Sequence, residues 1–189
     1  MAELEYPFTE EKVRALRVGE MVRVHGLVFT GRDRLHRFLA EGGTCPVDFH
    51  DGAIYHCGPV MVRREGNWMV RAAGPTTSVR QEPYMAQIIA EHKVRLIIGK
   101  GGMGEPTRKA CREHGCAYVQ TVGGAASLLA SRIQRVLGQH YLREFGSADA
   151  LWMLRVEGME GVVTMDAAGK SLYRKVALAS KRRMKELLQ

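Results

Sequence analysis

Apolar and polar positions alternate along this chain in a way that divides it into short strands followed by amphipathic helices. Residues 21–29 combine β-branched and apolar side chains at near-alternate spacing, and an amphipathic stretch follows to about Ala40. The same order recurs after the strand patterns at residues 68–72, 94–98 and 116–121. Four strand-then-helix units predict βα crossovers and a mostly parallel sheet.

Short-range signals place the ends of the predicted helices. Thr30 and Asp33 are spaced as a capping box at the start of the first helix. The second helix either is capped by Ser78 with Gln81 or begins at Pro83, which suits a first helical position and leaves residues 76–80 as a loop. Pro106 suits the start of the third helix, which runs to about His114. The fourth helix is predicted to run from Ala125 through Ile133.

The pattern changes after the fourth helix and predicts antiparallel additions. Residues 150–156 and 161–165 have the pattern of strands, and residues 166–169 form a turn into a last extended piece at 170–173. Residues 176–189 are predicted to form a basic helix, and residues 55–62 fit a strand or a loop. The predicted fold is α/β, with one domain over residues 1–189 and a core over about 10–175.

Composition and charge narrow the class of protein. The net charge of +8 raises the possibility of nucleic-acid binding, but basic residues are scattered, and the one dense run, residues 181–185, lies on the predicted C-terminal helix. That run favours a solvated face or a docking surface. No apolar run reaches the roughly 20 residues of a membrane span, and residues 1–10 lack the apolar region of a secretory signal. A cytoplasmic location without membrane contact is expected.

The four cysteines do not predict a disulfide scaffold or a metal site. Cys45, Cys57, Cys111 and Cys116 are irregularly spaced, without a CxxC pair or zinc-finger spacing. We expect reduced, mostly buried thiols, and no metal held by this chain alone.

Three cations occupy turns that run from a predicted strand into a predicted helix. They are Arg32, Arg80 and Lys100. Such turns lie on one side of an open α/β sheet, where free backbone N–H groups and helix dipoles favour anions. Two guanidinium groups and one ammonium suit a small molecule with two carboxylates, and the alternative is that each is an ordinary surface residue.

Other polar or flexible residues share these turns. Thr76 and Thr77 either orient a carboxylate or a water, or only satisfy loop backbone groups. His36 lies one turn after Arg32 and is a candidate for the same crevice. The glycine pattern around Gly101 resembles a dinucleotide motif, but the next strand lacks the acidic residue that binds a ribose, so these glycines are interpreted as allowing positive φ angles and a close approach to a ligand.

Five motifs in order resemble the β portion of class I fumarases and L-tartrate dehydratases, which are iron–sulfur hydro-lyases. They are FTGRD at residues 29–33, IYHCGP at 54–59, GPTTSVR at 74–80, IGKGGMG at 98–104 and VGGAA at 122–126. The resemblance covers about residues 10–175 and implies a swivelling-domain-like fold. Glycine stands at position 31 where alanine is frequent in that family, and Gln81 stands where methionine is common.

The resemblance implies a partner, a cofactor and a set of roles. An α subunit would bring three cysteines that hold a [4Fe-4S] cluster with one open iron. Arg32, Arg80 and Lys100 would hold the substrate's carboxylates, and Thr76 would act as base or proton relay once activated by a group from the α subunit. Thr77, Gly101 and His36 complete the expected substrate-binding set, in a higher-order αβ assembly.

The function expected from this resemblance is the reversible addition of water to fumarate to give L-malate. Dehydration of L-tartrate is the nearest alternative. A non-enzymatic anion-binding or nucleic-acid-binding domain is the alternative from a different class.

Overall fold

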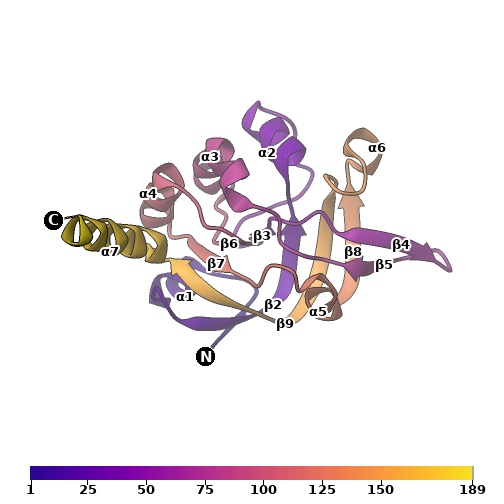
Figure 1. Cartoon of the computed structure of the whole chain (residues 1–189). Coiled ribbons are helices and arrows are strands. Elements are labelled where there is room, and N and C mark those ends of the chain that lie inside the picture. Colours follow the sequence, from indigo (N-terminus) through magenta and orange to yellow (C-terminus); the bar gives the residue numbers. More distant parts are fainter. Residues whose placement is uncertain (189) are drawn as a thin grey trace.

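Five parallel strands form the centre of the computed structural model, which describes residues 1–188 (Figure 1). In spatial order they are β1 (Ala2–Glu5), β2 (Met21–Thr30), β3 (Ala53–Tyr55), β6 (Leu96–Gly99) and β7 (Ala117–Gln120). The short strand β1 pairs with the first half of β2, and β3 pairs with its second half. The right-handed crossovers that join parallel strands bring all their carboxyl ends to one edge.

A long antiparallel strand closes this sheet on itself. Strand β9 (Leu151–Met165) pairs with β2 along most of its length and with β7 near its end, so the pairings β2–β3–β6–β7–β9–β2 form a ring. Strand β8 (Ile133–His140) adds to the outer side of β9. Closure leaves β2 and β7, which would otherwise expose edges, paired on both sides.

The helices are distributed around this ring, and a hairpin projects from it (Figure 1). The outer layer consists of α2 (Asp33–Ala40), α3 (Glu82–His92) and α4 (Glu105–His114). The shorter elements are α1 (Glu10–Ala15), η1 (Ser78–Gln81), α5 (Ala126–Ser131) and α6 (Leu142–Phe145). Strands β4 (Val60–Arg64) and β5 (Asn67–Ala72) form the separate two-stranded hairpin.

Alternation along the strands divides the interior into two cores. Ile98 and Val119 point into the ring, whereas their neighbours Ile97 and Tyr118 face the layer of α2, α3 and α4. Each fully buried large apolar side chain contributes about 1.5–3 kcal/mol. A one-residue shift in register would exchange the two faces, so the two cores together fix the register of the parallel strands.

The predicted fold class is confirmed as a single-domain α/β fold with a mostly parallel sheet and antiparallel additions. One assignment within it was wrong, because β5 belongs to the hairpin and not to the sheet. The sheet strand that precedes α3 is β3, in the region that the sequence pattern did not settle.

Three predictions after residue 125 were also wrong. The fourth helix ends at Ser131, and Ile133 begins β8. The two strands predicted at 150–156 and 161–165 are one continuous strand, β9. The extended piece predicted at 170–173 makes only one bridge, between Met165 and Ser171, before the last helix begins.

The predicted capping box at Thr30 and Asp33 does not form. The residue at the N-cap of α2 is Arg32, and no side chain caps it. The Thr30 hydroxyl instead accepts a hydrogen bond from the Trp152 backbone N–H at 3.0 Å and donates to the Ala150 carbonyl at 3.2 Å. Tertiary contacts with β9 therefore replace the expected local cap.

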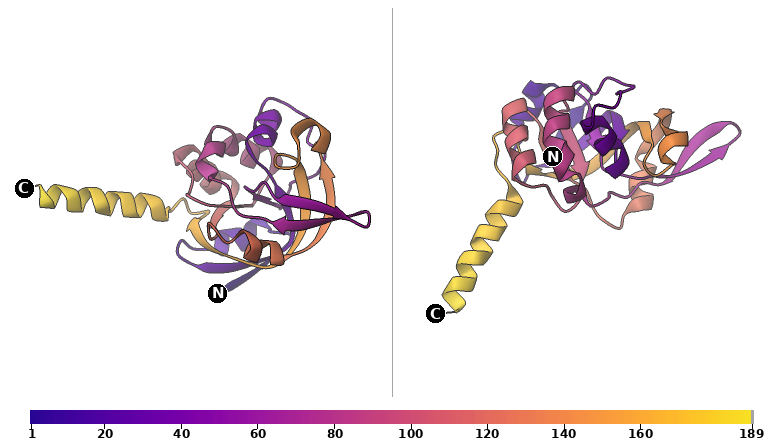
Figure 2. Two further views of the ribbon diagram at one scale, coloured as in Figure 1. Left: turned by 45° about the vertical axis from the view of Figure 1, so that its right-hand side comes forward. Right: turned by 90° about the horizontal axis from the view of Figure 1, so that it is seen from above.

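The last helix, α7 (Leu172–Leu187), extends away from the body of the molecule (Figure 2). Its N-cap is Ser171, whose hydroxyl accepts from the Arg174 backbone N–H, and none of its residues is buried. The predicted basic helix is therefore present and begins before residue 176, while Gln189, the last residue of that prediction, lies outside the described residues. Within residues 1–188, no helix has the length and apolar character that crossing a membrane requires.

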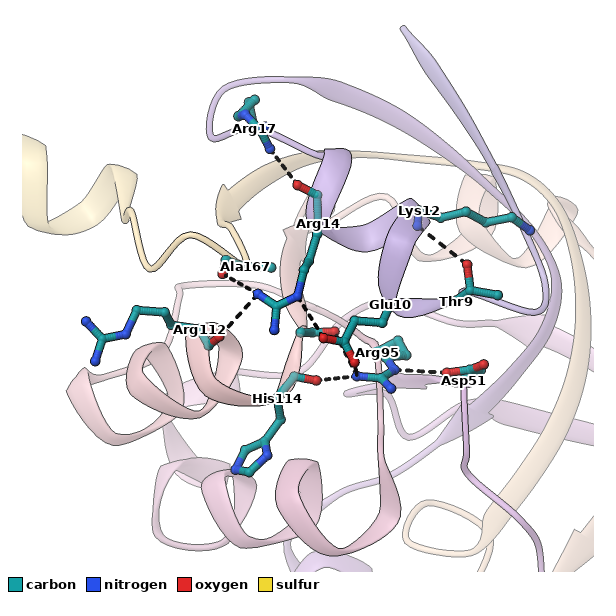
Figure 3. Close-up of polar contacts among 11 residues, drawn as sticks. Thr9, Glu10, Lys12, Arg14, Arg17, Asp51, Arg95, Arg112, His114 and Ala167 are labelled. Atoms are coloured by element: carbon teal, nitrogen blue, oxygen red, sulfur yellow. Dashed lines mark hydrogen bonds and ion pairs between the residues drawn. The ribbon is translucent and has the colours of Figure 1, made fainter.

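At the edge of the sheet where the parallel strands begin, one arginine binds groups from three segments of the chain (Figure 3). The guanidinium of Arg95 lies 2.9 Å from a carboxylate oxygen of Asp51 and 3.1 Å from one of Glu10, and it donates to the His114 carbonyl. Its side chain is only 8% exposed. One cation therefore joins α1, the chain before β3 and the end of α4.

We predict that Arg95→Leu lowers the free energy of unfolding by about 3 kcal/mol, because it leaves a half-buried carboxylate and a carbonyl without their cation. The control is Arg23→Leu, since Arg23 also pairs with two glutamates but is 44% exposed, so its loss should lower the free energy of unfolding much less. Urea unfolding curves of both variants measure the difference. Equal losses would contradict the structural role of Arg95.

Candidate functional site

The carboxyl ends of the parallel strands meet at one edge, and hydrogen bonds tie the exits together. The Gly31 N–H donates to the Tyr55 carbonyl at 3.0 Å, and the His56 N–H donates to the Ile98 carbonyl at 2.8 Å. Arg32 follows the first exit and Lys100 follows β6 directly. Both cations therefore leave the same edge, as the sequence pattern predicted.

The loop that carries the threonines crosses this edge. The Thr76 N–H donates to the His56 carbonyl at 2.7 Å, and the Ser78 N–H donates to the Lys100 carbonyl at 3.0 Å. Thr77 forms a parallel bridge with Lys100. The loop thus reaches the edge through the β3–β6 crossover, although β5, which leads into it, is not a strand of the sheet.

A buried hydroxyl holds that loop in place. The Ser78 hydroxyl accepts from the Lys100 N–H at 3.2 Å and from the Tyr118 phenol at 2.9 Å, and the phenol oxygen accepts from the Gly102 N–H at 3.3 Å. A Cβ at Gly99 would lie 2.0 Å from the Ser78 oxygen, so only glycine fits there. The position of the Lys100 turn therefore depends on Ser78 and Tyr118.

Arg32 is partly buried beside a second motif glycine. A Cβ at Gly58 would lie 2.6 Å from an Arg32 Nη and 2.7 Å from the Ala148 carbonyl. The glycine of the segment after β3 therefore leaves room for the guanidinium. Within residues 1–188 the Arg32 Nε is buried without a hydrogen-bond acceptor. This is a donor whose desolvation is offset only if a ligand or partner supplies an acceptor.

Arg80 is the exposed end of a polar chain that runs into the interior. It pairs with Asp33, which also accepts from the Gln81 amide N–H. The Gln81 amide oxygen lies 3.0 Å from Nδ1 of His36. Since an amide oxygen only accepts, His36 carries its proton on Nδ1. Asp33 and Gln81 thereby fix an arginine whose side chain is otherwise 56% exposed.

Only some of the glycines after Lys100 have the positive φ angles that the sequence predicted. Gly101 and Gly102 have φ of 79° and 77°, which are left-handed values. Gly104 has φ of −86° and instead lies close to Glu82, whose carboxylate accepts from the Gly104 and Thr107 backbone N–H groups at 2.6 and 3.0 Å. Glu82 therefore anchors the Lys100 turn to α3.

His36 lies beneath the edge and not on its surface. It is fully buried, and its ring packs edge-to-face against His56 with centroids 5.2 Å apart. Burial lowers the pKa of His36 to about 4, and burial and the neighbouring His36 lower the pKa of His56 well below its ordinary value. Both rings are therefore neutral near pH 7. A direct contact between His36 and a ligand stays a prediction.

The cysteines of this chain are free thiols, three of them buried. Burial raises the pKa of Cys57 to about 12, so it is a protonated thiol at neutral pH. Within residues 1–188, no group of three or more His, Cys, Asp or Glu side chains is arranged to hold a metal ion.

The structure brings most of the predicted site residues to one edge. Arg32, Thr76 and Lys100 are partly buried there, and Thr77, Arg80 and Gly101 are exposed. Sequence reasoning considered Ser78, Gln81 and Asp33 only as helix caps and missed their roles at this edge. No local signal marks the roles of Ser78 and Gln81, because their partners Tyr118 and His36 are distant in sequence.

Comparisons with known proteins agree, over nearly the whole chain, with the family resemblance of the five sequence motifs. Residues 1–176 match the family described as Fumarase C-terminus. The chain belongs to this family. It is 48% identical over 178 residues to a protein of Geobacillus stearothermophilus named putative fumarate hydratase class I, covering 94% of this chain and 34% of that protein.

Two further relatives are named as beta subunits. The chain is 33% identical to the putative L(+)-tartrate dehydratase subunit beta of Methanocaldococcus jannaschii, covering 98% of this chain and 99% of that protein. It is also 33% identical to the L(+)-tartrate dehydratase subunit beta of Escherichia coli, over 88% of this chain and 83% of that protein. The chain therefore spans 34% of the Geobacillus protein, 99% of the Methanocaldococcus subunit and 83% of the Escherichia coli subunit.

We predict that this member of the Fumarase C-terminus family loses stability as the pH falls from about 6.5 to 4. In that window the unfolded chain binds protons on His36 and His56 while the folded chain does not, so each histidine lowers the free energy of unfolding by up to about 1.4 kcal/mol per pH unit. Urea unfolding at pH 7, 5.5 and 4.5 measures the slope. His56→Leu should flatten it, and an unchanged slope would contradict this account.

Proposed function

We propose that this chain is the β portion of an iron–sulfur hydro-lyase that reversibly adds water to fumarate to give L-malate in the cytoplasm. The observation that carries the choice of fumarate is the 48% identity to the Geobacillus protein named as a class I fumarate hydratase. The site edge supports it, because its three predicted cations suit a substrate with two carboxylates.

The arginines and the lysine would do different work on such a substrate. A guanidinium offers paired donors that match one carboxylate, whereas an ammonium acts as a compact charge. Arg32 has a buried Nε without an acceptor, and Arg80 already holds the carboxylate of Asp33. In our proposal Arg32 binds a carboxylate through this unpaired donor, and Arg80 through the N–H donors that Asp33 leaves free. In our proposal Lys100 contributes the third positive charge beside them.

Thr76 would hold or move the proton at the carbon next to the hydroxyl-bearing one. Its backbone is held at the edge by the hydrogen bond from its N–H to the carbonyl of His56, the residue after β3. A threonine hydroxyl is a poor base by itself and needs activation. In our proposal the activating group comes from the α subunit. Thr77 and the Gly101 backbone would complete the carboxylate contacts.

The [4Fe-4S] cluster would come with the α subunit. The described cysteines and carboxylates of this chain do not form a ligand set for it, so no step is assigned to the cluster here. A cluster iron with an open position supplies Lewis-acid polarisation of a hydroxyl and a carboxylate.

An α subunit also fits the openness of the site edge. Arg80, Thr77 and Gly101 are exposed in this chain, whereas dicarboxylate chemistry of this kind needs a site from which bulk water is excluded. About two thirds of the Geobacillus relative lies outside the part that this chain matches. We propose that a separate α subunit supplies the corresponding cover.

Dehydration of L-tartrate is the second candidate. It is favoured by the match to 99% of the Methanocaldococcus protein, which is named as a putative L(+)-tartrate dehydratase subunit beta. Both substrates are four-carbon dicarboxylates, so the same three cations would serve either. Anaerobic co-production with the α subunit, followed by fumarate and tartrate assays, separates the two.

In the assembled enzyme we predict that Arg80→Ala and Lys100→Ala each lower kcat/KM by about 10-fold or more, which corresponds to about 1.4 kcal/mol of lost transition-state stabilisation. Arg37→Ala is the control, since Arg37 lies on the outer surface of α2 and pairs only with Glu41. Steady-state rates with fumarate measure all three. Full activity of both test variants would exclude them as carboxylate ligands.

A further inference from the structure

One face of α7 is apolar and, within residues 1–188, has no partner along most of its length. The described residues of α7 are all at least partly exposed, and Val176 is 58% exposed, Met184 55% and Leu187 70%. These three follow Tyr173 by 3, 11 and 14 residues, close to whole helical turns, which places them on one stripe of the α-helix. Exposed apolar stripes of this kind mark interaction surfaces.

At the base of α7 this stripe borders a groove. The groove has a volume of about 650 Å³ and is lined by Gln120, Val162, Thr164, Leu172, Tyr173, Val176, Ala177 and Ser180. Its lining is mostly apolar, and it lies between α7 and strands β7 and β9. The stripe and the groove form one continuous surface, which we call the α7 arm surface.

The α7 arm surface is next to the edge that carries the candidate site. Gln120 ends β7 and pairs with Gly99, the residue before Lys100. The Tyr173 ring lies against Gly102, where a Cβ would come within 2.4 Å of it. A protein bound in the groove therefore lies beside the Lys100 turn, where the proposed function needs cover.

Charge indicates what kind of partner fits. The helix carries six basic residues and a single acidic one: Arg174, Lys175, Lys181, Arg182, Arg183 and Lys185 against Glu186. Two such helices packed together would bring like charges close, which opposes a second copy of this chain. The stripe has no Trp or Phe to anchor it in a lipid interface. A partner surface with an apolar ridge flanked by acidic side chains would complement the groove and the basic side of the helix.

We propose that the α7 arm surface binds the α subunit, through an apolar ridge of that subunit that enters the groove and an acidic flank that pairs with the basic side of the helix. This inference rests on the proposed function, because it takes the α subunit as the source of the missing cover. The match to the family model ends at residue 176, within α7, whereas the alignment with the Methanocaldococcus subunit covers 98% of the chain and so includes most of this helix. In our proposal the outer turns of α7 extend the contact beyond the edge that carries the candidate site.

The test uses a matched pair of substitutions on the full-length chain. Val176→Asp places a charge in the groove, whereas Leu137→Asp places the same charge on an exposed residue of β8, at 47%, that is part of neither α7 nor the groove lining. Binding to the anaerobically purified, cluster-loaded α subunit is measured by biolayer interferometry, and folding of each variant is checked by thermal unfolding. We expect Val176→Asp to weaken binding about 10-fold or more and Leu137→Asp to leave it within about 2-fold.

Charge reversal provides a second variant that leaves the groove intact. Lys181→Glu combined with Lys185→Glu should weaken binding and should also remove much of its dependence on salt between 50 and 300 mM. Both measurements address affinity and are independent of turnover.

The outcomes separate this inference from the proposed function. Unchanged affinity in Val176→Asp would overturn the arm surface while leaving the αβ enzyme intact. Absence of any binding by the wild-type chain would overturn the proposed α subunit itself. A wild-type homodimer in light scattering that Val176→Asp dissociates, or wild-type binding to anionic phosphatidylserine vesicles that Val176→Asp abolishes, would replace the α subunit with a second copy or a membrane.

Discussion

The Ser78 hydroxyl connects the two segments on which the candidate site depends. It accepts hydrogen bonds from the Lys100 backbone and from the Tyr118 phenol, and Tyr118 in turn accepts from Gly102. Ser78 is fully buried, so an unpaired donor at this point would cost about 1–3 kcal/mol. The threonine loop and the lysine turn therefore occupy fixed positions relative to each other, although neither is part of a regular strand or long helix.

The closed sheet gives this connection a rigid base and separates stability from chemistry. Closure by β9 encloses one core, and the helices α2, α3 and α4 enclose the other, so β3, β6 and β7 are covered on both faces. At the edge where the strands begin, the cation of Arg95 is saturated by carboxylates and carbonyls. At the opposite edge, Arg32 keeps a buried donor without an acceptor, and Arg80 stays exposed although it pairs with Asp33. A buried donor without an acceptor within the described residues calls for a ligand or a partner.

The parallel sheet and the placement of Arg32 and Lys100 were predictable from sequence, because strand-to-helix order fixes which edge the turns share. The same rule does not place Arg80, because β5 is not a strand of the sheet. Other features were not predictable. β9 reads as two strands because Gly158 and Gly161 interrupt its pattern, yet only Gly158 has a positive φ and pairing continues on both sides of it. β8 has no fully buried residue and no clear alternation of burial. The chain Asp33–Gln81–His36 joins residues 45 to 48 positions apart, which no local pattern shows.

The central claim is that Arg32, Arg80 and Lys100 hold one dicarboxylate. The most direct measurement is a crystal structure of the anaerobically assembled αβ enzyme with L-malate bound. The account predicts electron density for the ligand at the carboxyl edge of β2, β3 and β6, with one carboxylate on a guanidinium and Lys100 within hydrogen-bond reach. A ligand bound elsewhere, with the three cations turned toward solvent or toward separate partners, would contradict it.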